Sequence, residues 1–295
     1  MRDIRQSPQF ARFMETLGWK TETVGKNRVY LKKFPILGFF AKIPRLTLPL
    51  EWKKLEQLKE KYRIFKLKLA PHLTINDKKY YKYKKALQDN GFAIEQSPFN
   101  PVTTILIDLT QSESKLFNNF SPAKCRAVRR AQKNNIVVKV TDDFESFIKI
   151  RKRQYFPMGF LMEKEMHALW KSFYPSHASL LLAYPPTQTE KSSQTHATAY
   201  ICDAQPVGGI LLLFYKKVAY YWLASALKEG KLLFAPTLLV WEALQLAKKR
   251  GCNVFDFEGI YDERFPKASE SWRGFTKFKE GFGGKKVMFM ENFTS

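Results

Sequence analysis

Four basic side chains in the middle of the chain are spaced so that they can act together. Residues 121–135 read SPAKCRAVRRAQKNN, where Ser followed by Pro signals a helix start and two asparagines signal its end. The cations stand at i, i+3, i+4 and i+7, which places them on one helix face: Arg126, Arg129, Arg130 and Lys133. Like charges on one stripe repel, and a bound polyanion would relieve that repulsion. The alternative is an exposed face in a protein that is basic throughout.

The whole chain is basic. Its 295 residues include 50 Lys and Arg against 27 Asp and Glu, which gives a formal net charge of +23. An excess of this size attracts polyanions such as tRNA, DNA or an anionic membrane face. The alternative is a lysine-rich proteome whose solvated surfaces are simply basic. Charge alone does not distinguish among these partners.

Cysteines and histidines show no pattern typical of a metal site or a disulfide framework. Cys125, Cys202 and Cys252 are widely separated, and the four histidines lack ligand-like spacing. We therefore expect no metal. The longest apolar run, residues 207–215, is far shorter than the roughly 20 residues of a membrane-spanning helix. Because the N-terminus is polar as well, we expect a cytoplasmic protein.

The elements that would position these side chains follow a mixed α/β pattern, in a chain long enough for two domains. Helices are expected at residues 8–17, 50–61, 77–90, 121–135, 142–155, 163–174 and 236–250. Strands are expected at 28–34, 38–43, 62–69, 103–109, 137–140, 197–202, 207–215, 218–226, 253–257 and 286–290, with a flexible loop at 185–195. The helices at 77–90 and 236–250 both end in glycine before a strand, which indicates a duplicated unit.

The C-terminal part of the chain carries the strongest local signal. Asp256-Phe257-Glu258-Gly259-Ile260 follows a strand, and Phe278-Lys279-Glu280-Gly281-Phe282-Gly283-Gly284 comes shortly after. With the helix LLVWEALQLAKKRG, the block CRAVRRAQKNN and the openings SPQF and LGWK, these motifs span nearly the whole chain. In this order they resemble the FemABX family of aminoacyl-tRNA-dependent peptidoglycan bridge aminoacyltransferases. The chain is too short to hold the coiled-coil insertion of some members.

This resemblance implies two tandem GNAT-like (acyl-CoA N-acyltransferase-like) domains with mixed α/β sheets. The first is expected at 1–108, with 287–295 returning to it, and the second, which carries the catalytic segment, at 109–286. The implied activity moves an amino acid from aminoacyl-tRNA to the stem-peptide amine of a peptidoglycan precursor, lipid-linked or nucleotide-linked. We expect no tightly held cofactor and no DNA partner, and a lipid-linked precursor would bring a peripheral contact with the inner membrane face.

The resemblance also implies roles for individual residues. Lys279, of the Phe278–Lys279 pair, is the catalytic candidate, because a fixed ammonium can stabilise the negative charge that ester aminolysis puts on the carbonyl oxygen. The tRNA 3′ end favours a cation and an aromatic surface. Asp256 or Glu258 could accept the proton of the attacking amine. The alternatives are a solvated surface lysine at 279 and a helix- or turn-capping role for the two acids.

Contacts with the acceptor are expected from Lys20 and Tyr221, and contacts with tRNA from the basic stripe. The chain also departs from the family's pattern. Residues 160–174 contain no arginine, and Leu223 stands where relatives often have an aromatic hydroxyl. The acceptor is therefore either the usual precursor, another precursor form, or a molecule other than peptidoglycan.

Two other functions remain open. One is an acyl-CoA-dependent GNAT N-acyltransferase acting on a sugar or amine. Ordinary GNAT enzymes bind the CoA pyrophosphate on an R/Q-x-x-G-x-G/A loop at a helix start. Residues 228–236 read KEGKLLFAP, with one glycine and no such pattern, which disfavours this function. Gly281, Gly283 and Gly284 are more typical of turns than of a phosphate cradle. The other function is that of a catalytically silent nucleic-acid-binding protein that has kept the fold.

Overall fold

The computed structural model describes residues 3–157, 162–186 and 205–295. Contacts divide the chain into two units. Unit 1 consists of Met1–Leu106, Glu258–Lys277 and Lys285–Ser295, and unit 2 consists of Ile107–Phe257 and Phe278–Gly284. Residues 258–277, which the family resemblance placed with the second domain, are thus grouped with unit 1.

Unit 1 is built on a six-stranded sheet with the strand order β1-β2-β3-β4-β13-β5. The strands are β1 (Lys20–Val24), β2 (Asn27–Phe34), β3 (Gly38–Leu46), β4 (Ile64–Pro71), β5 (Ala93–Ile94) and β13 (Phe293–Thr294). Neighbours pair antiparallel, except that β3 and β4 are parallel. The parallel pair needs a crossover connection, which helix α2 (Trp52–Tyr62) provides.

The two faces of this sheet are covered by different helices. Alternation along β2 sends Val29 and Leu31 into a core shared with α2 and α3 (Tyr80–Asp89). Tyr30 faces the other way and packs on Phe10 of α1 (Pro8–Thr16), with ring centroids 5.8 Å apart. The expected start of α1 is confirmed, because the Ser7 side chain accepts a hydrogen bond from the Phe10 N–H at 3.0 Å.

The short strand β13 completes the sheet of unit 1. Phe293 pairs with Leu69 of β4 on one side and with Ile94 of β5 on the other. Phe293 and Met290 are both fully buried in the core of this unit. The last residues of the chain are therefore an integral part of the first sheet.

A second sheet has the strand order β12-β6-β11-β10-β9-β8-β7. Its strands are β6 (Thr103–Asp108), β7 (Val137–Thr141), β8 (Ala178–Tyr184), β9 (Gly208–Tyr215), β10 (Val218–Ala226), β11 (Val254–Asp256) and β12 (Lys285–Met288). Strands β7 to β10 pair antiparallel, and β10 and β11 pair in parallel. By contacts, β12 and residues 103–106 of β6 are counted with unit 1.

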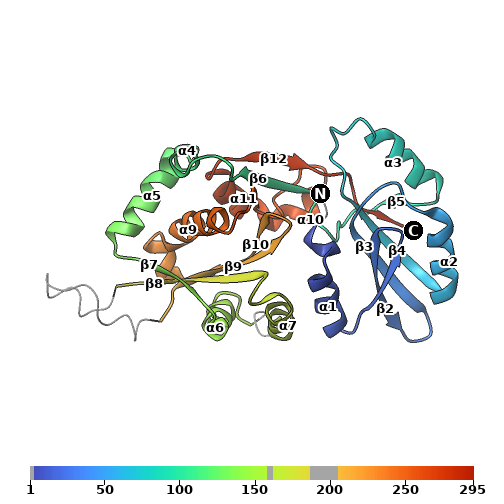
Figure 1. Cartoon of the computed structure of the whole chain (residues 1–295), viewed down its shortest axis with the longest axis horizontal. Coiled ribbons are helices and arrows are strands. Elements are labelled where there is room, and N and C mark those ends of the chain that lie inside the picture. The colour runs from blue at the N-terminus through green and yellow to red at the C-terminus, as the bar shows by residue number, and fades with distance from the viewer. Residues whose placement is uncertain (1–2, 158–161, 187–204) are drawn as a thin grey trace. The chain divides into compact units, whose positions relative to one another are not determined.

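Helices cover both faces of the unit 2 strands. Helices α5 (Pro122–Lys133) and α9 (Ala235–Lys249) pack together on one face, while α6 (Phe144–Gln154) and α7 (Glu163–Phe173) lie on the other (Figure 1). Shorter helices join these elements. They are α4 (Glu113–Asn118), α8 (Lys228–Leu232), α10 (Pro266–Ser269) and α11 (Arg273–Glu280), with 3-10 turns at Ile4–Gln6 and Glu270–Trp272.

Both units contain the same succession of elements, an antiparallel hairpin followed by a helix and a parallel strand. In unit 1 this is β2-β3-α2-β4, and in unit 2 it is β9-β10-α9-β11, with the short helix α8 inserted before α9. The expected equivalence of the helix at 77–90 with that at 236–250 is therefore wrong. Helix α3 leads into β5, which pairs antiparallel with β13, whereas α2 and α9 each lie between two strands that pair in parallel.

Several elements differ from the expected ones. The helix expected from residue 77 begins at Tyr80, because the Asp77 carboxylate accepts the Lys79 N–H at 2.8 Å and holds a turn there. The expected strand at 197–202 and most of the loop at 185–195 lie outside the described residues. Strands β1, β5 and β8 and the shorter helices were not expected. No helix of the described chain is long and apolar enough to cross a membrane.

Candidate functional site

Lys279 lies in the last turn of α11 and is buried, with 7% of its surface exposed. Its ammonium nitrogen is 5.7 Å from the centroid of the Tyr221 ring on β10. Burial raises the pKa of the Tyr221 phenol, so this side chain keeps its proton at neutral pH. Because Lys279 is buried, the alternative of a solvated surface lysine at this position is wrong.

A continuous group of aromatic rings lies around this lysine. Phe278 contacts Phe282 with ring centroids 5.1 Å apart, and Phe282 contacts Phe257 at 5.8 Å. Phe257 in turn lies 5.5 Å from Tyr221. We call Tyr221, Phe257, Phe278 and Phe282 the aromatic cluster. Tyr221 lies on β10, Phe257 directly follows β11, Phe278 lies on α11 and Phe282 follows that helix. Phe257 and Phe282 are fully buried, whereas the partly exposed Phe278 offers a ring of the kind on which nucleobases stack.

A second lysine reaches the same cluster from helix α5. The ammonium nitrogen of Lys124 is 3.7 Å from the centroid of the Phe278 ring and 4.9 Å from that of Phe282. Burial lowers the pKa of Lys124 to about 8. The sequence did carry a signal for this inward position, because Lys124 precedes the buried residues Val128 and Ala131 by four and seven positions. The spacing of the exposed stripe did not indicate this inward position of Lys124.

The start of α5 is fixed to the chain just after α11. The Ser121 side chain caps α5, and its backbone N–H donates to the Gly281 carbonyl at 2.8 Å. A Cβ atom at Gly281 would come within 2.8 Å of Lys124 Cε, so glycine leaves the space that the lysine stem occupies. Gly283 and Gly284 have φ values of +75° and +94°, as turn-forming glycines do.

The two candidate acids have different surroundings. Asp256 ends β11, is buried, and lies opposite Tyr220 in the parallel pair with β10. Glu258 belongs to unit 1, where both of its carboxylate oxygens accept hydrogen bonds from Arg5, at 2.5 and 3.3 Å. Arg5 also pairs with Asp3 at 3.2 Å. This arrangement favours a structural role for Glu258, whose φ of +59° is unusual for a side chain of its kind.

The basic stripe forms as expected on the outer face of α5. All four cations are exposed: Arg126, Arg129, Arg130 and Lys133. Within the part of the chain that the structure describes, no carboxylate forms an ion pair with any of them. The guanidinium of Arg129 lies 5.8 Å from the Phe117 ring, and that of Arg130 lies 5.6 Å from the Phe234 ring. The stripe is thus available to a polyanion.

Lys20, the other expected acceptor contact, is an exposed residue of unit 1. Its ammonium nitrogen is 4.9 Å from the centroid of the Tyr62 ring and 3.9 Å from a Glu22 oxygen. A hydrogen bond with Tyr62 raises the pKa of Lys20. Tyr221 lies in unit 2, so the two expected acceptor contacts belong to different units.

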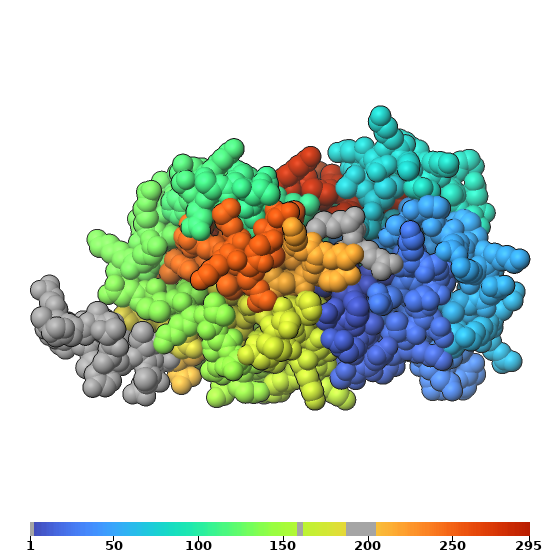
Figure 2. Space-filling view, in the orientation of Figure 1, coloured from blue at the N-terminus to red at the C-terminus, as the bar shows by residue number. Residues whose placement is uncertain are grey.

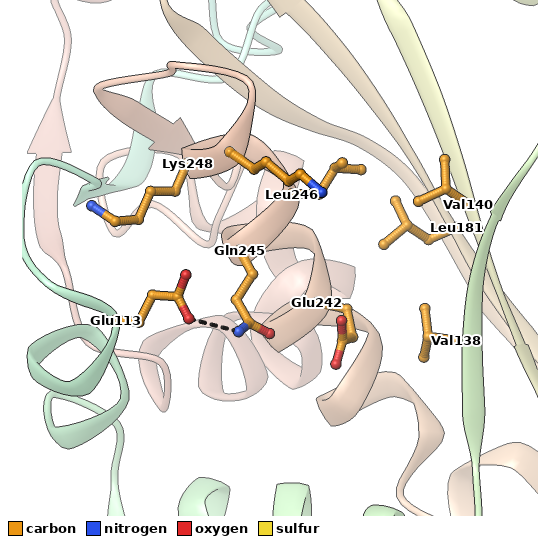
Figure 3. A pocket seen from close by; sticks show the side chains of 9 residues that line it. Glu113, Val138, Val140, Leu181, Glu242, Gln245, Leu246 and Lys248 are labelled. Atoms are coloured by element: carbon orange, nitrogen blue, oxygen red, sulfur yellow. Dashed lines mark hydrogen bonds between the residues drawn. The ribbon is translucent and has the colours of Figure 1, made fainter.

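Unit 2 also contains a cavity of about 660 Å³. Figure 3 shows Glu113, Glu242 and Gln245 on one side of it and Val138, Val140 and Leu181 on the other. Gln245 donates to Glu113 at 2.8 Å, and burial, with a smaller effect of Glu113, raises the pKa of Glu242. In Figure 2 the orange surface of α9 is visible beside the green segment that contains α4 and α5.

The segment that would hold a CoA pyrophosphate in an ordinary GNAT enzyme has another geometry. Gly230, its single glycine, lies inside α8 and is buried. A Cβ atom there would come within 2.5 Å of the Val207 carbonyl oxygen, so this glycine allows close packing on the neighbouring backbone. Phe234, with a φ of +61°, leads into α9. The only glycine of the segment therefore has a packing role.

Similar solved structures define the class of fold to which this chain belongs. The structure is similar to that of FemX, with a TM-score of 0.79 and 14% identity over 99% of this chain and 92% of that one. It is also similar to a tandem GNAT protein from the clavulanic acid biosynthesis pathway, with a TM-score of 0.52 and 10% identity over 91% and 78%. The C-terminal domain of a putative lysylphosphatidylglycerol synthetase from Agrobacterium fabrum gives 0.59 and 12% over 99% and 88%. The chain therefore has a tandem GNAT-like fold with mixed sheets.

The sequence of the C-terminal part matches a known family. The model of the FemAB family matches residues 184–295, a range that contains Asp256, Glu258 and the Phe278–Lys279 pair. The C-terminal part of the chain is therefore similar to the FemAB family. No curated protein matches its sequence significantly.

Proposed function

We propose that this protein is an aminoacyltransferase that moves an amino acid from aminoacyl-tRNA to the stem-peptide amine of a peptidoglycan precursor. The match of residues 184–295 to the FemAB family model and the structural similarity to FemX support this proposal. The observation that carries it is the buried ammonium of Lys279 beside the aromatic cluster. We also propose that residues 109–286 form the catalytic domain, with 1–108 and 287–295 as its companion.

The reaction needs a positive charge where the oxyanion develops. When an amine attacks the ester carbonyl, the carbonyl oxygen becomes negative, and a preorganised ammonium stabilises it most where water is largely excluded. Lys279 meets this requirement because it is 7% exposed and lies at the end of a helix. The partly exposed ring of Phe278 would receive the terminal adenine or the ribose of the tRNA. Asp256 is the remaining acidic candidate in unit 2.

Recognition of the tRNA would use the basic stripe on α5. Each of its exposed cations can contact a phosphate and release the counterions held there. These contacts carry no sequence information, so they would position any charged tRNA. Selection of one amino acid over another would then depend on side chains nearer Lys279.

The acceptor is proposed to be a lipid-linked or nucleotide-linked precursor, bound with the help of Lys20 and Tyr221. The phenol of Tyr221 keeps its proton, so it can donate a hydrogen bond beside Lys279. Cytoplasmic location and a peripheral contact with the inner membrane face are parts of the same proposal. They agree with a basic chain whose acceptor is anionic.

The test is transfer in vitro. Purified protein is incubated with charged total tRNA and with a nucleotide-linked or a lipid-linked precursor, and the acceptor is analysed by mass spectrometry. We expect a mass increase of at least one aminoacyl residue that RNase treatment of the tRNA abolishes. The matched reaction contains acetyl-CoA in place of tRNA. Transfer from CoA, or micromolar binding of acetyl-CoA by calorimetry, would contradict the proposal and favour the acyl-CoA-dependent alternative.

A further inference from the structure

Lys124 is the second ammonium group at the aromatic cluster, where it contacts the rings of Phe278 and Phe282. Its nitrogen lies 3.7 Å from the centroid of the Phe278 ring, immediately before Lys279 in the chain, and 4.9 Å from that of Phe282. In the described part of the chain, no carboxylate lies within 4 Å of it and no hydrogen bond to its ammonium is present. The side chain is only partly buried, so a substrate can reach it.

Charged neighbours do not explain the behaviour of this lysine. The elements around it carry these charged or titratable groups: Glu113 and Lys115 on α4; Cys125, Arg126, Arg129, Arg130 and Lys133 on α5; Glu242, Lys248 and Lys249 on α9; Arg273, Lys277, Lys279 and Glu280 on α11; and Tyr221 on β10. Burial alone lowers the pKa of Lys124 to about 8. A substantial fraction of this side chain is therefore a neutral amine just above neutral pH, whereas an ordinary lysine is almost wholly protonated.

We propose that Lys124 is a further catalytic residue, whose neutral amine takes a proton from the attacking nitrogen of the acceptor and returns it to the departing ribose oxygen. This inference depends on the transfer reaction proposed above. It gives the two lysines separate tasks on the aromatic cluster. Lys279 is proposed to stabilise the oxyanion, and Lys124 changes its protonation state during the reaction.

The step balances without any further reactant. The acceptor's neutral amine attacks the ester carbonyl carbon, and a C–N bond forms while the carbonyl oxygen becomes negative. The new nitrogen is positively charged and gives one proton to Lys124. The C–O bond to the ribose then breaks as the carbonyl re-forms, and the Lys124 ammonium protonates the leaving oxygen. An ester and an amine have become an amide and an alcohol, and Lys124 is neutral again.

Gly281 fixes the path of the Lys124 side chain. A methyl group at this position would lie 2.8 Å from Lys124 Cε and 2.9 Å from Cγ, so the lysine stem would have to move. Because the φ of Gly281 is not in the left-handed region, alanine is compatible with the backbone there. Gly281→Ala should therefore displace Lys124 without unfolding the protein, and we expect a lower transfer rate in this variant.

The deciding variants are Lys124→Arg and Lys124→Met, studied with the full chain. Arginine keeps a cation on the rings but stays protonated, so it cannot accept a proton at neutral pH. Both variants should lower single-turnover transfer from charged tRNA by about 10²-fold or more, the usual contribution of general acid–base catalysis. The pH profile of the wild-type rate should contain a titration near pH 8 that is missing from the profile of Lys124→Arg. Titration of the acceptor amine should appear in both profiles. Lys115→Arg and Lys115→Met, at an exposed lysine of α4, serve as controls.

A second measurement does not depend on activity. Trace labelling of the wild-type protein with acetic anhydride across a pH series, followed by mass spectrometry of peptides, compares Lys124 with Lys115. Lys124 should become reactive about two pH units earlier, in keeping with the pKa of about 8. Titration of both lysines at the same pH would overturn the inference, and so would a Lys124→Arg variant with the wild-type rate. A wild-type protein that transfers nothing refutes the proposed function itself, whereas an active wild type with an unimpaired arginine variant refutes only the role of Lys124.

Discussion

Replacement of Lys279 by alanine should separate catalysis from stability. If its ammonium stabilises the oxyanion, the variant loses one preorganised donor, which lowers turnover by about 10²–10³, or about 2.7–4 kcal/mol of barrier. The folded state loses less. The ammonium lies 5.7 Å from the Tyr221 ring centroid, and such a contact contributes about 0.5–2 kcal/mol. That corresponds to a few degrees in melting temperature, so the variant remains folded during the assay.

The assay is single-turnover transfer from charged tRNA at saturating acceptor, with thermal melts of each variant. Acceptor affinity should change little, because the charge that Lys279 meets develops only during the reaction. Lys279→Arg should restore only part of the rate, because a planar guanidinium cannot place its charge where a compact ammonium lay. Lys277→Ala, at an exposed lysine of the same helix, is the matched control and should stay within about twofold of wild type. A folded Lys279→Ala protein that keeps more than a tenth of the wild-type rate would refute the catalytic assignment.

Three further predictions concern other parts of the molecule. Arg129→Ala with Arg130→Ala should weaken tRNA binding and lower the slope of log K against log salt by about 0.7–0.9 per lost contact, and an unchanged slope would remove the stripe from the tRNA site. Arg5→Met should destabilise unit 1 by about 3–5 kcal/mol in denaturant titrations, since it strips a buried carboxylate of its partner, whereas Glu258→Gln should keep near-normal transfer if Glu258 is structural. Glu242→Gln should raise the melting temperature at neutral pH and leave it unchanged in acid. The raised pKa means that ionisation of Glu242 costs folding stability as the pH rises, so the opposite trend would show that the carboxylate has a favourable partner.

Much of the fold was predictable where a local signal fixes an element. Ser7-Pro8 and Ser121-Pro122 mark helix starts, and both serines accept the expected capping hydrogen bond. The strand at 218–226 has the expected limits. The face of α5 that carries the stripe was predictable too, because helical spacing alone decides which side chains share a surface.

The parts of the structure that were not predicted depend on contacts between distant parts of the chain. Arg5 and Glu258 are far apart in sequence, and no local pattern around either residue indicates that they pair. Strand β13 has two residues, too few for any periodicity, and is fixed by its neighbours β4 and β5. Lys279 was placed by family resemblance, since its burial comes from packing around α11 that no sequence window contains.

The position of β13 has a consequence for synthesis of the protein on the ribosome. Strand β4 ends at Pro71, and all residues from 72 to 292 are made before β13 can be inserted beside it. At about 5–20 residues per second this takes on the order of tens of seconds. During this time β4 and β5 have no partner between them, and the places of Met290 and Phe293 in the core are empty. The earliest unit to emerge is thus the one that cannot finish folding until translation has reached the last strand, and its open strand edges are a natural target for a chaperone.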